Sequence, residues 1–308
     1  KRTLTFYNHY DVQPVEPLNQ WETDPFKSTI IKDRFFARGS ADNKGSMLSR
    51  ICAVDAYMKV YKKLPLNIKF IIEGEEEIGS PNLREFFKKY PGKLQTDGII
   101  WEGGSKNISG HLQIVLGVKG ICYVELRCTG AKNDLHSSNA AIVENPAWKL
   151  VWALSTLKNN KDEILIDGFY DQIKKPTYED MNYLEDILYE EEEMKRSMGI
   201  TNFINNLTGI ELKKKLLYEP TCNISGMESG YIGKGSKTVL PSLAKVKIDF
   251  RLVPNQKPEE IIPILRKHLD NNGFENIEII YMSGKNPYLT DSNSLLVKTV
   301  IENVERIY

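Results

Sequence analysis

Four glutamates fall within five positions of this sequence: Glu73, Glu75, Glu76 and Glu77. They come directly after an apolar run, residues 68–72, which predicts a buried strand. Like charges this close repel one another, so a bound divalent cation would stabilise the cluster. Taken alone, an acidic cluster is also typical of a solvated loop. A metal site would therefore need further ligands from elsewhere in the chain.

Further candidate ligands follow other predicted strands in the first third of the chain. His9 lies just after an alternating, β-rich segment at residues 3–7, and Glu102 directly follows another short predicted strand. Asp42 lies in a turn-rich loop at residues 38–45. Strands and helices alternate here, which predicts an α/β layer with a mostly parallel sheet flanked by helices. Ligands bind such sheets beyond the carboxyl ends of the strands, so we expect these side chains to converge on one edge.

The converging residue types suit zinc. Catalytic zinc takes histidine nitrogen and carboxylate oxygen atoms and keeps one position open. Two ions that share a carboxylate can hold both a water molecule and a substrate carbonyl, and a free carboxylate then serves as the base. The chain offers four ligands, and Glu76 is left over as the base: His9, Asp42, Glu77 and Glu102.

Asp11 stands two residues after His9. Along an extended segment it would face the same side, where it could accept the other imidazole N–H and fix the tautomer. Each residue alone also has a simpler interpretation. A histidine at a strand end often makes only a polar contact, and an aspartate before Asn-Lys-Gly, such as Asp42, is often a turn former.

The composition is that of a globular protein. The chain has 308 residues, of which 41% are hydrophobic and 27% charged, and its net charge is zero. This balance argues against a nucleic-acid groove or a membrane-binding face. No apolar run approaches the ~18 residues of a transmembrane helix. The four cysteines form no C-x-x-C pair, so we expect buried, reduced thiols and a cytoplasmic protein. Both ends look cut from a longer chain, because one resembles a strand interior and the other a helix interior.

A second unit is predicted from about Gly117 onwards. Its pattern reads strand, helix, charged helical insertion, strand, helix, strand, which predicts a small α+β (ferredoxin-like) sandwich. Its clearest strand is at residues 244–252, where apolar and charged residues alternate. We expect a catalytic metal-binding domain at residues 1–116, an inserted lid and dimerisation domain at 117–287, and a return to the first domain at 288–308.

Six motifs carry a resemblance to a known family. In chain order they are His-Tyr-Asp-Val-Gln-Pro at 9–14, Gly-Ser-Ala-Asp-Asn-Lys-Gly at 39–45, Glu-Gly-Glu-Glu-Glu-Ile-Gly-Ser at 73–80, Asp-Leu-His-Ser at 134–137, Gly-Ser-Lys-Thr-Val-Leu-Pro at 235–241 and Phe-Arg-Leu-Val-Pro-Asn at 250–255. Together they resemble the signatures of the carnosinase/aminoacylase family of dinuclear zinc hydrolases. That family also includes glutamate carboxypeptidases, acetylornithine deacetylase and succinyl-diaminopimelate desuccinylase.

The resemblance implies a role for each candidate residue. Four residues would ligate the two ions: His9 and Glu102 the first, Glu77 the second, and Asp42 both. The resemblance also implies a cis peptide bond between Asp42 and Asn43. Glu76 would be the general base, and Asp11 would orient His9. In the lid, His136 would polarise the scissile carbonyl, and in dimeric members that histidine comes from the other subunit. Thr238 and Arg251 would bind substrate, with Arg251 clamping a carboxylate.

Two of the lid residues also have simpler interpretations. His136 could merely stabilise its loop, and Arg251 could form a surface salt bridge. The family also places a terminal histidine ligand of the second ion near the C-terminus. After Arg251 the only histidine is His268, within a helix predicted at residues 258–271, and it is a poor candidate. We therefore expect the sequence to be part of a longer chain, the alternative being a protein that cannot hold its second metal.

These observations predict a metal-dependent amide hydrolase. It would cleave dipeptides or the C-terminal residues of short peptides with a water molecule that bridges two divalent ions, most often zinc, with manganese or cobalt as alternatives. Two other functions stay open: an N-acyl-amino-acid deacylase of the acetylornithine deacetylase/desuccinylase type, and a non-catalytic relative that only binds peptides. We expect a homodimer formed through the lid, and no nucleic-acid or membrane partner.

Overall fold

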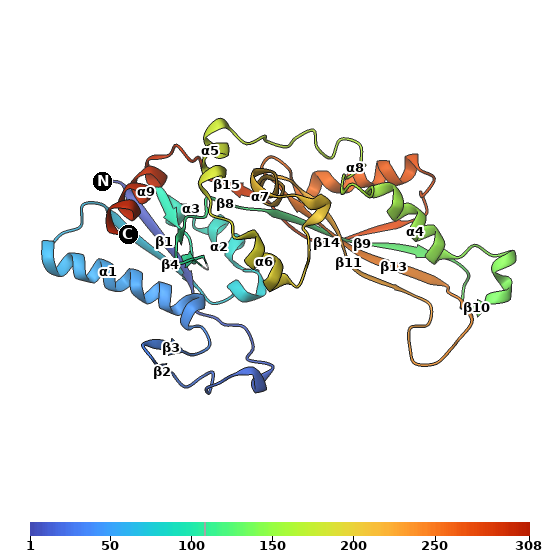
Figure 1. Cartoon of the computed structure of the whole chain (residues 1–308), viewed down its shortest axis with the longest axis horizontal. Helices are drawn as coiled ribbons and strands as arrows, with labels where there is room; N and C mark the ends of the chain where they lie inside the picture. The colour runs from blue at the N-terminus through green and yellow to red at the C-terminus, as the bar shows by residue number, and fades with distance from the viewer. Residues whose placement is uncertain (108) are drawn as a thin grey trace. The chain divides into compact units, whose positions relative to one another are not determined.

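The structure is a computed structural model that describes residues 1–107 and 109–308 (Figure 1). Two compact units make up the chain. The first comprises residues 1–114 and 299–308, and the second comprises residues 115–298. The terminal helix α9 (Leu295–Ile307) contributes to both.

A three-stranded parallel sheet organises the first unit. Its strand order is β4-β1-β5, with β1 (Thr3–His9) between β4 (Asn67–Glu73) and β5 (Gly98–Ile100). The carboxyl end of β1 is fully buried. By contrast, β4 was expected to be a buried strand, and this is wrong: none of its residues is buried and Ile72 is 42% exposed. The reason is that β4 is an edge strand of the described sheet and has β1 on one side only.

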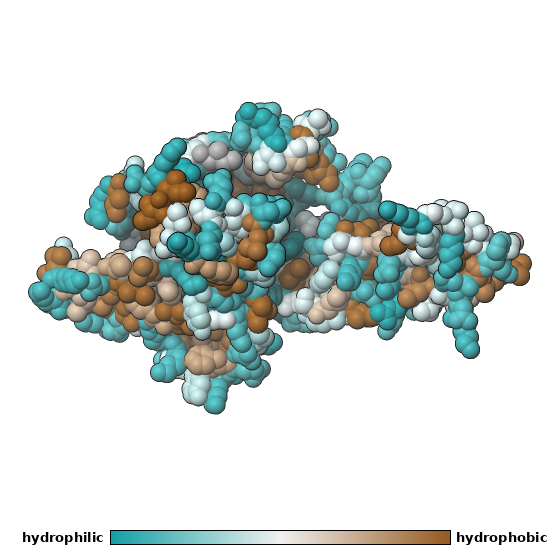
Figure 2. All heavy atoms as spheres, turned by 90° about the horizontal axis from the view of Figure 1, so that it is seen from below, coloured by the Kyte–Doolittle hydropathy of each residue, from teal (hydrophilic) through white to brown (hydrophobic). Residues whose placement is uncertain are grey.

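The first unit also contains one long helix, two short helices and two short ladders. They are α1 (Ser46–Tyr61), α2 (Leu83–Lys89), α3 (Pro91–Leu94), the hairpin of β2 (Thr29–Ile31) and β3 (Arg34–Phe36), and the ladder of β6 (Ser105–Lys106) and β7 (Leu112–Gln113). No residue of α1 is buried, and large apolar side chains gather over it (Figure 2, left). Cys52 on α1 is therefore exposed, so the expectation of four buried thiols is wrong for this one, although the other three are buried. The cytoplasmic location drawn from these thiols stays a prediction.

The second unit is built on a four-stranded antiparallel sheet. The order is β11-β13-β9-β14, from strands β9 (Gly120–Thr129), β11 (Thr221–Ser229), β13 (Leu243–Leu252) and β14 (Glu278–Lys285). Two helices, α4 (Pro146–Leu157) and α8 (Pro258–Asn271), supply the other half of its core. The predicted alternation of β13 is confirmed, because every second residue from Ala244 to Leu252 is buried. Together with the parallel sheet of the first unit, this confirms the α/β fold class with an α+β second part.

The remaining elements of the second unit are short. Three helices occupy the charged insertion: α5 (Tyr178–Asp186), α6 (Glu191–Met198) and α7 (Gly209–Tyr218). Two ladders pair β8 (Gly117–Val118) with β15 (Tyr288–Leu289) and β10 (Leu135–His136) with β12 (Val239–Leu240). Among the described residues, no helix is both long and apolar enough to span a bilayer.

Candidate metal centre

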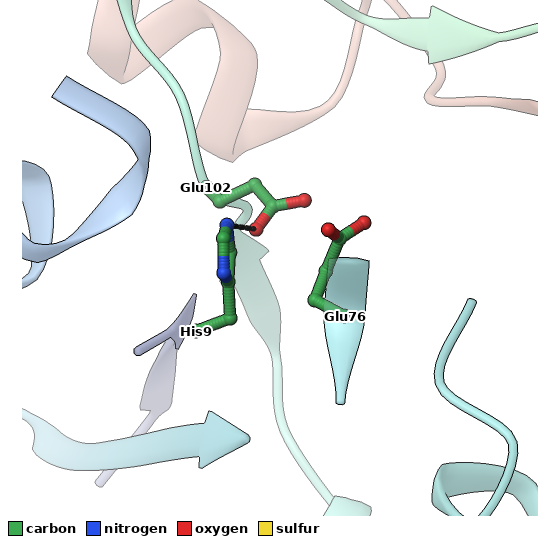
Figure 3. A group of neighbouring side chains, drawn as sticks. All are labelled: His9, Glu76 and Glu102. Carbon is green, nitrogen blue, oxygen red and sulfur yellow. Dashed lines mark ion pairs between the residues drawn. The ribbon is translucent and has the colours of Figure 1, made fainter. Parts of the chain in front are cut away.

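His9 lies at the carboxyl end of the central strand β1, and its side chain is 1% exposed. Its Nε2 atom is 2.9 Å from Oδ1 of Asp42. The same atom is 3.3 Å from Oε2 of Glu102, and Figure 3 shows this pair. Its Nδ1 atom lies 3.2 Å from the carbonyl oxygen of Asp11 and 3.3 Å from Oδ1 of the same residue. One ring nitrogen therefore faces two carboxylates, and the other is held by the residue predicted to orient it.

Two groups of potential ligand atoms share His9. The first contains His9, Glu76 and Glu102, and the second contains His9, Asp42 and Glu77. Within each group the ligand atoms all lie within 4.8 Å of one another. Figure 3 shows the carboxylates of Glu76 and Glu102 turned toward the same space beside the imidazole. The five residues that the sequence predicted to converge are therefore brought together by the fold.

The four glutamates at residues 73–77 fall into two pairs with different contacts. Glu73 accepts hydrogen bonds from the hydroxyls of Tyr7 and Ser80, and Glu75 accepts from the amide of Asn82. These two glutamates therefore hold the turn after β4. Glu76 and Glu77 begin the short 3₁₀ turn Glu76–Ile78 and belong to the two ligand groups.

Glu77 is fixed from the segment that follows β1. Its backbone N–H donates to Oδ2 of Asp11 at 2.9 Å. The side-chain amide of Gln13 donates to Oε2 of Glu77 at 2.8 Å and to its carbonyl oxygen at 3.2 Å. Gln13 was not singled out from the sequence, although it stands in the His-Tyr-Asp-Val-Gln-Pro motif.

Asp42 belongs to the turn Ser40–Gly45, which precedes α1. Its peptide bond to Asn43 is cis, as the resemblance implies. The side chain of Asp42 is 74% exposed, whereas Asn43 is buried and accepts a hydrogen bond from the amide of Asn8. The turn is thus anchored beneath the carboxylate that reaches His9.

The electrostatics of the site favour a bound cation. Burial raises the pKa of Glu76 and of Glu102, and the neighbouring carboxylates raise both further. Burial acts to lower the pKa of His9, but its hydrogen bond to Asp42 and the charge of Glu102 outweigh this effect and raise that pKa. Crowded carboxylates of this kind are stabilised in their charged form by a divalent ion.

The residues fit such an ion in two further respects. Oε2 of Glu102 is a buried oxygen without a hydrogen-bond partner among the described residues, which is uncommon in folded proteins. The donor set of one imidazole nitrogen and several carboxylate oxygens is the type that catalytic zinc uses. Two atoms that share one tetrahedral zinc are about 3.3 Å apart, and His9 Nε2 and Glu102 Oε2 are separated by 3.3 Å.

The candidate residues of the second unit fall at two ends of its sheet. His136 pairs with Val239 in the β10–β12 ladder, so it lies beside Thr238, and both side chains are exposed. This ladder adjoins the Leu243 end of β13, because Ser242 donates to Asp134. Arg251 stands eight residues further along β13, or about 27 Å at the usual rise of a strand.

Arg251 is 52% exposed, and its Nε lies 3.6 Å from Oδ1 of Asp249. The second unit therefore presents His136 with Thr238 at one place and Arg251 at another. His268, the only histidine after Arg251, is buried, and its Nε2 lies 3.0 Å from the Thr156 hydroxyl. Of the described residues, His9 is the only histidine in a ligand group, so the expectation that His268 is a poor ligand agrees with its position.

Comparisons with known proteins add to this geometry. A family model for peptidase family M20/M25/M40 matches residues 5–308. The crystal structure of an M20 family metallo-carboxypeptidase from Sulfolobus solfataricus is 44% identical, with a TM-score of 0.91 over 100% of this chain and 70% of that one. The Beta-Ala-His dipeptidase of Rattus norvegicus is 32% identical over 95% of this chain and 61% of its own length. The Cys-Gly metallodipeptidase of Schizosaccharomyces pombe is 33% identical over 87% of this chain and 57% of its own length. The chain thus spans about three fifths of these two curated relatives.

Proposed function

This chain belongs to peptidase family M20/M25/M40, and from that membership we propose that the protein is a metal-dependent hydrolase that cleaves dipeptides or the C-terminal residue of short peptides. The observation that carries the proposal is the convergence of His9 with the four carboxylates of the two ligand groups. The names of the relatives support the substrate class, since they include two dipeptidases and a carboxypeptidase.

We further propose a role for each residue of the site. His9, Asp42, Glu77 and Glu102 would hold two divalent ions, most often zinc. When bound, such ions polarise an amide carbonyl and lower the pKa of a water molecule. Glu76 accepts the proton of the attacking water and returns it to the leaving amine. Asp11 holds the imidazole of His9 through Nδ1 and the Glu77 segment through its backbone N–H.

In the second unit, which we propose to be the lid, Arg251 clamps the C-terminal carboxylate of the substrate. Its exposed guanidinium can make two parallel hydrogen bonds to a carboxylate. His136 donates a hydrogen bond to the scissile carbonyl, and Thr238 contacts the substrate beside it. The first unit would be the catalytic domain.

The distance along β13 between Arg251 and the end beside His136 bears on the oligomeric state. A dipeptide is only several ångströms long, so one lid whose Arg251 is about 27 Å from the His136 end cannot place both on one substrate. We therefore propose a homodimer in which the partner subunit supplies His136 and Thr238 to a site that already contains Arg251.

A substrate panel tests the proposed function. The protein is stripped with a chelator, reloaded with Zn²⁺ or Mn²⁺, and assayed on dipeptides such as β-Ala-His and Cys-Gly and on N-acetyl amino acids. We expect cleavage of dipeptides that is lost with the chelator and restored by the metal. Preferential cleavage of the N-acetyl amino acids would instead identify a deacylase. A reloaded protein that binds peptides without cleaving them would identify a binding relative.

A further inference from the structure

Arg50 of α1 contacts the segments on both sides of two proposed metal ligands. Its Nη1 atom donates to the carbonyl oxygen of Tyr7 at 2.8 Å and to Oδ1 of Asn8 at 2.9 Å. Its Nη2 atom donates to the carbonyl oxygens of Trp101 at 2.5 Å and Gly103 at 3.5 Å. The first pair directly precedes His9 along the chain, and the second pair flanks Glu102.

These contacts begin where the sheet ladder ends. The last residue pair between β1 and β5 is Phe6 with Ile100. One residue further on, the rings of Tyr7 and Trp101 stack with centroids 3.8 Å apart, and Arg50 bridges their two carbonyl oxygens. The guanidinium and the stacked rings therefore keep the segments that follow β1 and β5 aligned beyond the last ladder pair, up to the residues that face the metal centre.

A third ligand segment joins the same network through Asn8. The amide of Asn8 receives the Arg50 hydrogen bond at Oδ1 and donates from Nδ2 to Oδ1 of Asn43. Asn43 follows Asp42, and both asparagines are buried. One side chain of α1 is thereby connected to the neighbours of His9, Asp42 and Glu102 without contacting a ligand atom of any of them.

We propose that Arg50 is a positioning residue of the metal centre. All four of its acceptors are neutral oxygens, although Arg50 lies near enough to Glu102 for the two charges to attract each other. A planar fork of fixed N–H donors can serve four acceptors at once, whereas a lysine ammonium has three donors from one point.

The test measures metal binding without turnover. Metal-free wild type, Arg50→Ala, Arg50→Gln and a matched control, Arg84→Ala on the exposed side of α2, are titrated with Zn²⁺ against a chromophoric chelator and with Co²⁺ by visible absorption. We expect Arg50→Ala to lower the Zn²⁺ affinity by ~10–100-fold, the usual effect of removing support behind metal ligands. Its Co²⁺ spectrum should also change. Arg50→Gln, which keeps two donors, should recover part of the affinity, and Arg84→Ala should match the wild type.

Circular dichroism and urea unfolding of each metal-free variant accompany the titrations. A folded Arg50→Ala protein with wild-type Zn²⁺ affinity and Co²⁺ spectrum would overturn the inference. Unfolding of both Arg50 variants would also overturn it, because Arg50 would then support the fold as a whole. The inference rests on the proposed metal site, and failure of that site has a different signature: wild-type protein that binds neither ion.

Discussion

The backbone N–H of Glu77 donates a hydrogen bond of 2.9 Å to Oδ2 of Asp11, and the other oxygen of that carboxylate lies 3.3 Å from Nδ1 of His9. One side chain therefore joins the segment after β1 to the turn after β4. The two backbone N–H groups of Glu77 and Glu76 also lower the pKa of Asp11 against the opposing effect of its burial. Asp11 is thus kept ionised where it can orient two ligands at once.

Replacing Asp11 should weaken metal binding more than it weakens the fold. We expect Asp11→Ala to lower the Zn²⁺ affinity by ~10–100-fold, because the ring of His9 and the turn of Glu77 lose their common anchor. Competition titration with a chelator measures the change. Asp55→Ala, which removes an exposed carboxylate of α1, is the control and should bind Zn²⁺ as the wild type does. Equal affinities for Asp11→Ala and Asp55→Ala would contradict this role.

Replacing Arg251 should act on substrate binding. We expect Arg251→Ala to raise KM by ~10-fold or more with a smaller change in kcat, because a charge-assisted hydrogen-bonded pair to the substrate carboxylate is lost. Arg251→Lys should restore little, since an ammonium cannot form the two parallel hydrogen bonds. Steady-state kinetics on a dipeptide and on its C-terminal amide separate the effects, because the amide should be insensitive to the substitution. An unchanged KM for the dipeptide would count against the clamp.

The proposed homodimer makes a complementation prediction. Glu76→Gln and His136→Ala should each be inactive, but a mixed dimer contains one site with both native residues. After exchange of subunits in an equal mixture, about a quarter of the wild-type activity should return, as a two-fold symmetric dimer requires. Light scattering confirms that the dimers persist. If the mixture stays inactive while subunit exchange is demonstrated, His136 acts within its own subunit or not at all.

Lys119 should make stability depend on pH. Its burial lowers its pKa to about 8 from 10.5, although it donates to the carbonyl oxygen of Glu219 at 2.5 Å. Below pH 8 both the folded and the unfolded chain carry this charge, so the full cost of burying it is present. Between that pH and 10.5 the unfolded chain binds the extra proton, so this residue's contribution makes stability rise with pH.

The variant Lys119→Met removes that cost. It should therefore unfold at a higher urea concentration than the wild type near neutral pH, and the difference should shrink as the pH approaches 10. Lys132→Met, at an exposed position of the same unit, serves as the control and should show no such trend. A difference between Lys119→Met and wild type that is constant over this pH range would show that desolvation of the ammonium is not its cause.

Local patterns in the sequence determine part of this fold. The helix α8 begins and ends where it was predicted, at residues 258–271, and β13 alternates as expected. The strand β11 has no clean alternation in the sequence, because Gly226 stands at a shift of register in its pairing with β13. The exposure of β4 and α1 could not be read from their apolar residues, because burial depends on which elements pack against them in space.

The candidate site, like the fold, could be predicted from the sequence only in part. His9 and its four carboxylate neighbours could be predicted because each follows a strand or lies in the loop that a strand leads into. Arg50 and Gln13 were missed because they act on backbone oxygens or on a single carboxylate, and no spacing marks such contacts. The distance between His136 and Arg251 depends on the length and register of β13, which the separate motifs do not contain.

The central claim is that Glu76 carries the proton while its neighbours hold the metal, and Glu76→Gln tests it most directly. Turnover of a dipeptide and bound metal per chain are measured on the same reloaded sample. We expect metal content near that of the wild type and a loss of kcat of ~10²–10⁴-fold, the range expected for a general base. A variant with near-normal turnover would contradict the account. So would a variant that loses its metal together with its activity, because Glu76 would then be a ligand.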